Sequence, residues 1–243
     1  MTPKKTTPIR EGKSKILYST DSPEHVIQFF KDDATAFNAL KKGTIKNKGF
    51  INNKVSSALF QYLENHGVKT HFVHYLSERE MLCKKLEIIP VEVVVRNRAA
   101  GSICKRLAIQ KGQTFEPALI EFFYKSDALG DPLIAESHIY HFKWATPKEL
   151  EVMITQSIRV NDLLKSVFSE IGLELIDFKL EFGREANSNV LLADEFTADG
   201  CRLWDKKTGE PMDKDRFRQD LGGVDEAYLE VSKRLQNYFE ASL

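Results

Sequence analysis

Cysteine is scarce in this chain of 243 residues, and long apolar runs are missing. The three cysteines, Cys83, Cys104 and Cys201, lie far apart and are odd in number, so they indicate neither a disulfide framework nor a CxxC metal site. We expect three reduced thiols. No stretch approaches the roughly 18 apolar residues of a membrane span, and the N-terminal MTPKKTTPIREGKSK lacks the apolar core of a signal peptide. The absences predict a cytoplasmic protein with no membrane partner.

The chain also has no excess charge of either sign. Lys plus Arg number 35 and Asp plus Glu number 35, so no nucleic acid or anionic membrane is expected as a partner, and anions must be attracted by local clusters. The six histidines form no HExxH pattern, and no GxSxG elbow occurs. Zinc-enzyme and serine-hydrolase functions therefore have no support.

Hydrophobic patterning predicts an α+β protein with a β-rich first third. The runs KSKILYS, HVIQFF, THFVHYL, MLCKKLEII and VEVVVRN have the composition of strands, and Pro90 marks a break between the last two. A helix is expected over 52–67, with Asn52 or Asn53 as its N-cap and Gly67 at its end. We expect a β-rich lobe over 1–86, a larger mixed lobe over 87–243, and a ligand cleft between them.

Helical spacing dominates much of the second lobe. One helix is expected from Ser102 to Gly112, and another over 224–239. The longest begins at Thr146, because Thr146, Pro147 and Glu149 form a capping box with proline at the first helical position. Its predicted core-facing stripe comprises Leu150, Met153, Ile154, Ser157, Ile158, Leu164, Val167, Phe168 and Ile171.

The segment DFKLEFGREANSNVLLADE places charges on alternate positions of an otherwise apolar strand. Asp177, Lys179 and Glu181 share one face, and a hairpin centred near Asn187 brings Glu181 opposite Asp194. Two close carboxylates repel each other unless a cation lies between them, and an oxygen-only ligand set suits Mg²⁺. The alternative is an amphipathic strand with its charged side in water.

Two further clusters could bind phosphate. Lys13 and Lys15 follow Gly12, which lets the backbone approach an anion, although lysines also protect edge strands from aggregation. Arg96 precedes a helix that begins near Ser102, and a helix N-terminus attracts phosphate, although a serine cap beside surface arginines fits the same pattern.

Other charged stretches are expected to be loops. KDDATAFN carries Asp32, Asp33 and Thr35 in a turn, and YKSDALGDP carries Lys125. A charged surface loop is predicted for the stretch that contains Asp199, Arg202, Asp205, Asp213, Lys214, Asp215, Arg216 and Arg218.

Taken together, eight ordered motifs resemble one family. GKSK, KDDATAFN, NNK, PVEVVVRNRAAGS, YKSDALGDP, DFKLEFG, LADEF and CRLWD…DKDRFRQDLGG, spread from Gly12 to Gly223, are similar in order and spacing to the SAICAR synthetases, the phosphoribosylaminoimidazole-succinocarboxamide synthases of purine biosynthesis.

The resemblance implies a ligase that joins the carboxylate of 5-amino-1-(5-phosphoribosyl)imidazole-4-carboxylate (CAIR) to the amine of L-aspartate with ATP and Mg²⁺. It also implies a two-lobed fold like that of kinases or ATP-grasp enzymes, with adenine near KKLEIIPVE, and a homodimer. Carried over by motif, Gly12, Lys13, Lys15 and Lys125 would contact ATP, Glu181 and Asp194 would hold Mg²⁺, Arg96, Ser102 and Arg202 would bind the CAIR phosphate, and Asp177, Lys179 and Asp199 would line its carboxylate end.

Two positions depart from the family pattern, and two other functions are alternatives. Ala198 stands where proline is common, which should loosen its loop. Ala39 stands where glycine is common, which should make its loop less flexible. A phosphotransferase acting on a hydroxyl would share the cleft, but no HRDxxxxN-type loop is present. A nucleotide-binding or RNA-binding module is disfavoured by the zero net charge and the lack of an RNP pattern.

Overall fold

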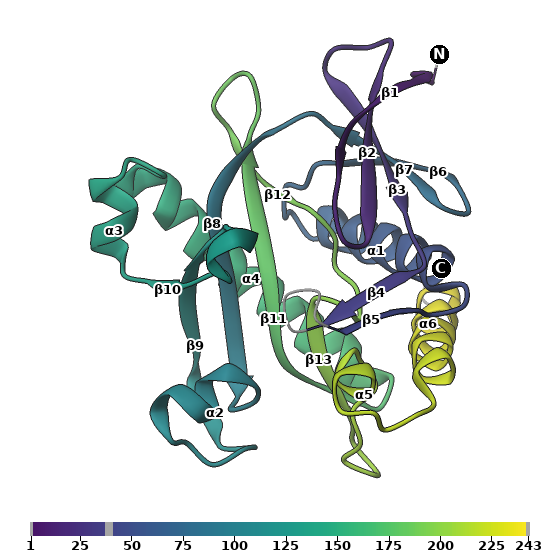
Figure 1. Ribbon diagram of the computed structural model, residues 1–243, viewed down its shortest axis with the longest axis vertical. Coiled ribbons are helices and arrows are strands. Elements are labelled where there is room, and N and C mark those ends of the chain that lie inside the picture. Colours follow the sequence, from purple (N-terminus) through teal and green to yellow (C-terminus); the bar gives the residue numbers. More distant parts are fainter. Residues whose placement is uncertain (1, 37–40, 242–243) are drawn as a thin grey trace.

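A five-stranded antiparallel sheet forms the N-terminal part of the protein. The computed structural model describes residues 2–36 and 41–241 (Figure 1). In spatial order the sheet contains β1 (Lys5–Glu11), β2 (Lys15–Thr20), β3 (His25–Phe30), β7 (Glu80–Lys84) and β6 (Phe72–Ser77). The predicted hairpin of β2 and β3 is confirmed, with Lys15 paired to Phe30 at its open end. This pairing fixes Lys15 at the end of β2 that faces the rest of the molecule.

Helix α1 (Lys48–Asn65) packs against β3, β6 and β7 of this sheet. It begins one turn before the predicted caps, because Asn47 adopts a left-handed conformation (φ 60°) and starts the helix without a side-chain cap. The N-cap prediction was therefore wrong. Asn52 and Asn53 are instead buried within the helix, and Asn53 Nδ2 donates to the carbonyls of Ser77 and Glu80.

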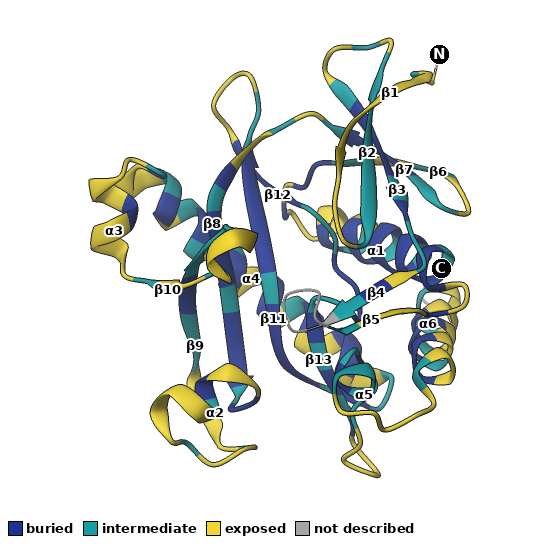
Figure 2. Cartoon of the chain, viewed as in Figure 1, coloured by how far each residue is buried: buried dark blue, intermediate teal, exposed yellow. Residues whose placement is uncertain are grey.

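The second sheet carries the longest strands. Its order is β10 (Leu133–Ile134), β9 (Thr114–Tyr124), β8 (Glu87–Arg98), β11 (Leu173–Arg184) and β12 (Val190–Ala193), and β13 (Cys201–Asp205) also pairs with β11. Strands β8 and β11 lie in its interior and are largely buried (Figure 2). Charged side chains on β11 are thus held on a rigid, buried strand.

Strand β8 runs straight through Pro90, where the sequence predicted a break. The chain actually leaves the first sheet at Lys85 and Leu86, between β7 and β8. Pro90 is tolerated because the pairing of β8 with β11 shifts register between Ile88 and Glu92, and prolines are accommodated at such bulges.

Helix α4 (Pro147–Glu170) covers the second sheet by packing against β8, β11 and β12. Its predicted capping box is confirmed: Thr146 Oγ1 accepts from the Glu149 amide at 3.3 Å, and Glu149 Oε2 accepts from the Thr146 amide at 2.7 Å. Most of the predicted stripe faces the core, but Ile158 is 48% exposed. The helical turn there buries Val160 and Asn161 instead.

The remaining elements are short, apart from the last helix. They are β4 (Asp33–Ala36), β5 (Lys41–Thr44), α2 (Ser102–Leu107), a 3₁₀ turn (Asp127–Leu129), α3 (Glu136–His141), α5 (Asp215–Arg218) and α6 (Val224–Ala241). Helix α2 ends before the predicted Gly112, because Ala108 turns into the left-handed region with φ 52°. The predicted C-terminal helix is confirmed as α6, which packs against α1.

Two predicted loops are wrong. Within KDDATAFN, residues 33–36 form β4, which pairs with β5; Ala39 lies outside the described residues. The charged stretch after Asp199 includes β13, and Asp205, Asp213 and Asp215 are all buried. Burial is possible because these carboxylates accept hydrogen bonds from backbone amides or arginines.

Backbone hydrogen bonds join the two sheets. The His71 amide donates to the Leu192 carbonyl at 2.8 Å, and the Leu192 amide donates to Lys69 at 3.0 Å. The end of β12, which leads to Asp194, is thereby fixed beneath the first sheet. The α+β prediction is confirmed, and the division into lobes at residue 86 stays a prediction.

The structure also shows the state of the three cysteines and the character of the helices. Cys83, Cys104 and Cys201 are all free thiols. Among helices of the described residues, none combines the length and the apolar character that a membrane crossing requires.

Candidate active site

Every site residue predicted from the sequence lines one of two adjoining cavities or both. The first, of about 460 Å³, is lined by Gly12, Lys13, Lys15, Lys125, Glu181 and Asp194 among others. The second, of about 280 Å³, is lined by Arg96, Ser102, Asp177 and Arg202. Lys179 and Asp199 line both. Glu92, Asp131 and Gly200 line both as well, so the cavities meet along these five residues. The individual roles of Lys179 and Asp199 stay predictions.

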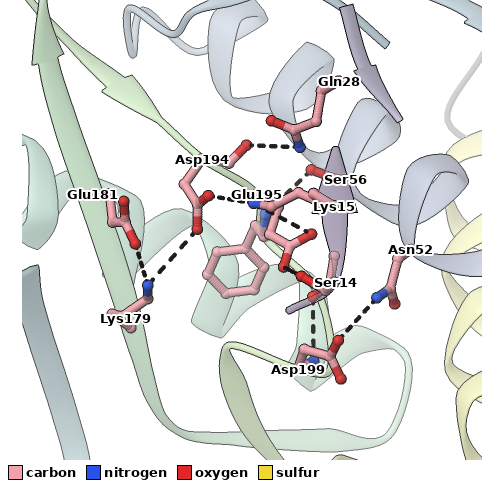
Figure 3. Close-up of polar contacts among 12 residues, drawn as sticks. Ser14, Lys15, Gln28, Asn52, Ser56, Lys179, Glu181, Asp194, Glu195 and Asp199 are labelled. Atoms are coloured by element: carbon pink, nitrogen blue, oxygen red, sulfur yellow. Dashed lines mark hydrogen bonds and ion pairs between the residues drawn. The ribbon is translucent and has the colours of Figure 1, made fainter. Parts of the chain in front are cut away.

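Lys179 lies between the two carboxylates predicted to hold a metal (Figure 3). Its Nζ is hydrogen-bonded to Glu181, lies 3.8 Å from Asp194 Oδ2, and lies 2.9 Å from Glu92 Oε1. The sequence predicted that Glu181 lies directly opposite Asp194. This register is wrong by one residue, because Glu181 pairs with Ala193 on β12. Asp194 follows the end of the strand with a left-handed φ of 67°, and its carboxylate still reaches the same lysine.

Both carboxylates are held in the ionised form. Burial and the Asp194 charge oppose ionisation of Glu181, but Lys179 and Lys125 outweigh them and lower its pKa. Burial likewise opposes ionisation of Asp194, whereas Lys15 and Lys179 hold its pKa well below the usual range. Burial acts against the charge of Lys179 too, but Glu181 and Asp194 raise its pKa well above the ordinary value. Lys179, Glu181 and Asp194 are thus all held in their charged forms.

The other predicted cations reach this cluster from separate segments. Lys15, on β2, is hydrogen-bonded to Asp194 and lies 3.7 Å from Glu195 Oε2. Lys125, after β9, donates to Glu181 Oε1 at 2.6 Å. Lys13 lies in the turn after Gly12 and pairs with Asp127 at 2.6 Å at the exposed rim. Cations from three parts of the chain converge on the first cavity.

Glu181 and Asp194 have the chemistry that Mg²⁺ requires. They are ionised, they are close enough to share Lys179, and Glu181 Oε2 accepts no hydrogen bond from any described residue. Within residues 2–36 and 41–241, no three His, Cys, Asp or Glu side chains converge as a metal site. The pair fits an ion that takes one or two carboxylates and completes its shell with phosphate oxygens and water.

In the second cavity, Asp177 holds two arginines rather than facing open space. Its Oδ2 lies 2.6 Å from Arg96 Nη1 and 2.9 Å from Arg202 Nη1. Burial raises the Asp177 pKa despite the charges of Arg202 and Arg96. Arg96 also pairs with Glu121 at 2.6 Å and is almost fully buried. The arginines are therefore fixed before any ligand enters.

Gly101 leaves room for the Arg202 guanidinium. Its φ of +67° suits glycine, and a Cβ there would lie 2.5 Å from Arg202 Nη2. The next residue, Ser102, begins α2, which has only six residues. Side-chain cations, more than the dipole of this short helix, supply positive charge to the second cavity.

Sequence reasoning missed the residues that hold Asp199. Its carboxylate accepts from Lys48 Nζ at 2.5 Å, from Asn52 Nδ2 at 3.3 Å and from the Tyr228 hydroxyl at 2.6 Å. Burial opposes its ionisation, but Lys214 and Lys48 hold the pKa well below the usual range. The NNK motif hinted at Asn52, whereas Lys48 and Tyr228 carried no local signal.

Two more cations were also missed as site residues. Lys214 lines the first cavity, with its Nζ 3.8 Å from Asp199 Oδ1. Arg218 lines the second cavity and pairs with Asp215 at 2.5 Å. The sequence predicts a surface loop for both, whereas Lys214 is the N-cap residue of α5 and Arg218 is the last residue of that helix.

Comparison with known proteins decides the family. The model of the SAICAR synthetase family matches residues 8–235. The chain belongs to the SAICAR synthetase family. The phosphoribosylaminoimidazole-succinocarboxamide synthase of Novosphingobium aromaticivorans is 57% identical over 230 residues, covering 93% of this chain and 88% of that protein.

Solved SAICAR synthetases share the fold. The crystal structure of the synthase from Ehrlichia chaffeensis has a TM-score of 0.93 and 48% identity, over 95% of this chain and 98% of that one. A SAICAR synthetase described in complex with ADP has a TM-score of 0.91 and 41% identity, over 94% and 97% of the respective chains. The predicted resemblance is confirmed over nearly the whole chain.

Proposed function

We propose that this protein uses ATP to join the carboxylate of CAIR to the amine of L-aspartate, giving SAICAR, ADP and phosphate. The observation that carries this proposal is the meeting of two charged cavities at Lys179 in a chain of the SAICAR synthetase family. One cavity has cations and a carboxylate pair suited to a nucleoside triphosphate, and the other has arginines suited to a phosphate ester.

The first step transfers the γ-phosphoryl group to the CAIR carboxylate, which is too poor an electrophile to be attacked directly. This transfer needs positioning and cations near the developing charge more than a covalent nucleophile. Lys15 and Lys125 would contact the phosphates, with Gly12 and Lys13 in the turn above them. Lys179, which lines both cavities, would lie beside the oxygen that accepts the phosphoryl group.

Mg²⁺ is part of the proposal, with Glu181 and Asp194 as its protein ligands. The ion would neutralise phosphate charge during transfer. The two carboxylates are now neutralised by Lys179, Lys125 and Lys15. When Mg·ATP is bound, these lysines can turn from the carboxylates to the phosphates, so the same residues serve both states.

In the second step, the amine of L-aspartate attacks the acyl phosphate carbon, the carbon–nitrogen bond forms and phosphate leaves. We propose that Arg96, Ser102 and Arg202 hold the CAIR phosphate and that Asp177 and Asp199 keep the surrounding cations in place. Lys214 and Arg218 are suited to the two carboxylates of L-aspartate, because they are cations that line the first and the second of the two adjoining cavities.

Phosphate release tests the proposal. Purified protein with ATP, Mg²⁺ and CAIR should release phosphate, in a one-to-one ratio with amide product, only when L-aspartate is added. Turnover with an alcohol in place of L-aspartate would instead indicate a phosphotransferase. Nucleotide binding without aspartate-dependent product would contradict the ligase assignment. The homo-oligomer and the cytoplasmic location stay predictions.

A further inference from the structure

A chain of alternating charges passes through the wall of the second cavity, and four of its seven members line that cavity. It connects α2 to α5 and contains one more cation than anion. In order, its members are Arg106, Glu121, Arg96, Asp177, Arg202, Asp215 and Arg218. Each of the four arginines is therefore held by at least one carboxylate.

Arg106 ends this chain without lining the cavity. Its Nη2 pairs with Glu121 Oε1, while Glu121 Oε2 holds Arg96 at 2.6 Å. Its Nη1 donates to Ser102 Oγ at 2.9 Å, and its guanidinium lies 5.5 Å from the centre of the Phe123 ring. Ser102 and Phe123 both line the cavity. Arg106 thus supports the cavity wall from behind.

The contact between Arg106 and Ser102 fixes the direction of a hydrogen bond. A guanidinium can only donate, whereas a hydroxyl can both donate and accept. Ser102 Oγ must therefore be the acceptor in this contact, and it makes no other hydrogen bond with the described residues. The contact is exposed, and the hydroxyl proton is available to a hydrogen-bond acceptor that enters the cavity, such as a phosphate oxygen.

We propose that Arg106 is a positioning residue for the phosphate group of the bound substrate. It orients the Ser102 hydroxyl as a donor, while Glu121 holds its own guanidinium in place, and it does not touch the phosphate itself. The inference rests on the proposed function only in taking the phosphate ester to be CAIR. It does not depend on the helix dipole, since the effect comes from one side-chain hydrogen bond.

Equilibrium binding of CAIR, measured by titration calorimetry without ATP or L-aspartate, tests this role. Arg106→Ala should weaken CAIR binding about fivefold, the scale of one hydrogen bond. Its effect should nearly vanish in a Ser102→Ala background, because Arg106 acts through that hydroxyl. Arg106→Lys should recover part of the affinity, since lysine can donate to Ser102 but cannot also reach Glu121 in the same fork.

Two controls separate positioning from general loss of structure. The CAIR nucleoside, which lacks the phosphate, should bind the Arg106→Ala variant as well as it binds the unaltered protein. Arg98→Ala removes a neighbouring arginine that pairs with Glu174 outside both cavities, and it should leave CAIR binding unchanged.

Several results would overturn the inference. They are unchanged CAIR binding by Arg106→Ala, independent losses for Arg106→Ala and Ser102→Ala, an equal loss of nucleoside binding, or weakened ADP binding in Arg106→Ala. Because turnover is not measured, these outcomes are distinct from a failure of the ligase assignment, which the phosphate-release assay tests separately.

Discussion

Lys179 Nζ is hydrogen-bonded to Glu181 and lies 3.8 Å from Asp194, so one cation contacts both predicted metal ligands. Glu181→Gln removes one of the two charges while keeping the shape of the side chain. We expect turnover at limiting Mg²⁺ to fall at least tenfold, about 1.4 kcal/mol or more, with part of the loss recovered at high Mg²⁺. Initial rates across a Mg²⁺ titration at fixed ATP measure this.

Glu174→Gln is the matched control, since Glu174 lies on the same strand but pairs with Arg98 outside the cavities. Its Mg²⁺ dependence should equal that of the unaltered protein. If Glu181→Gln also shows an unchanged Mg²⁺ dependence, Glu181 does not hold the metal.

Gly101→Ala should displace Arg202. The added Cβ would lie 2.5 Å from the guanidinium, so we expect KM for CAIR to rise severalfold while KM for ATP stays the same. Steady-state kinetics with each substrate varied in turn will show this.

Gly209→Ala separates the displacement of Arg202 from backbone strain. Gly209 has a similar φ of +72° but has nothing within 4 Å of its added Cβ. This variant should lose about 1 kcal/mol of stability and keep its KM for CAIR. A rise in KM for CAIR in both variants would show that strain, not displacement, is the cause.

Tyr228→Phe should destabilise the protein through Asp199. The Tyr228 hydroxyl is buried and donates to Asp199 Oδ1 at 2.6 Å, and the loss of a hydrogen bond to a charged group costs about 1.5–3 kcal/mol. Urea unfolding at neutral pH measures the change. Tyr140→Phe removes an exposed hydroxyl that contacts Glu136 at 3.2 Å and should change stability very little. Equal effects of the two substitutions would contradict the role assigned to Asp199.

The parts of the site that depend on local periodicity could be predicted from the sequence. Strand alternation placed Lys179 and Glu181 on one face, because side chains of a strand point to opposite sides in turn. The Thr146 capping box likewise located the start of α4, because its two partners are only three residues apart in the sequence. These features depend only on neighbours in sequence.

Features that depend on distant partners could not be predicted. Lys48 is fully buried because Asp199, 151 residues further along, supplies its counter-charge. The bulge that accommodates Pro90 depends on register with β11. Asp213 resembles a surface residue in sequence, yet its carboxylate accepts from the amides of Leu203 and Asp215 and is buried. From residue type alone, charged side chains such as these are expected to be exposed to solvent.

Asp213 should make stability depend on pH in an unusual direction. Burial and the neighbouring Asp215 raise its pKa from 3.8 to about 7. Because the folded state binds this proton more tightly than the unfolded state, the resulting stabilisation is complete below about pH 4 and is lost as pH rises to about 7. Asp213→Asn cannot titrate, so it should lack this dependence.

The measurement is the free energy of urea unfolding from pH 4.5 to 7.5, compared between the two proteins. Relative to Asp213→Asn, the unaltered protein should lose up to about 1.4 kcal/mol per pH unit. Asp162→Asn, an exposed site on α4, controls for the change in net charge and should run parallel to the unaltered protein. If Asp213→Asn also runs parallel, Asp213 is ionised throughout, and its two amide hydrogen bonds outweigh burial and the repulsion from Asp215.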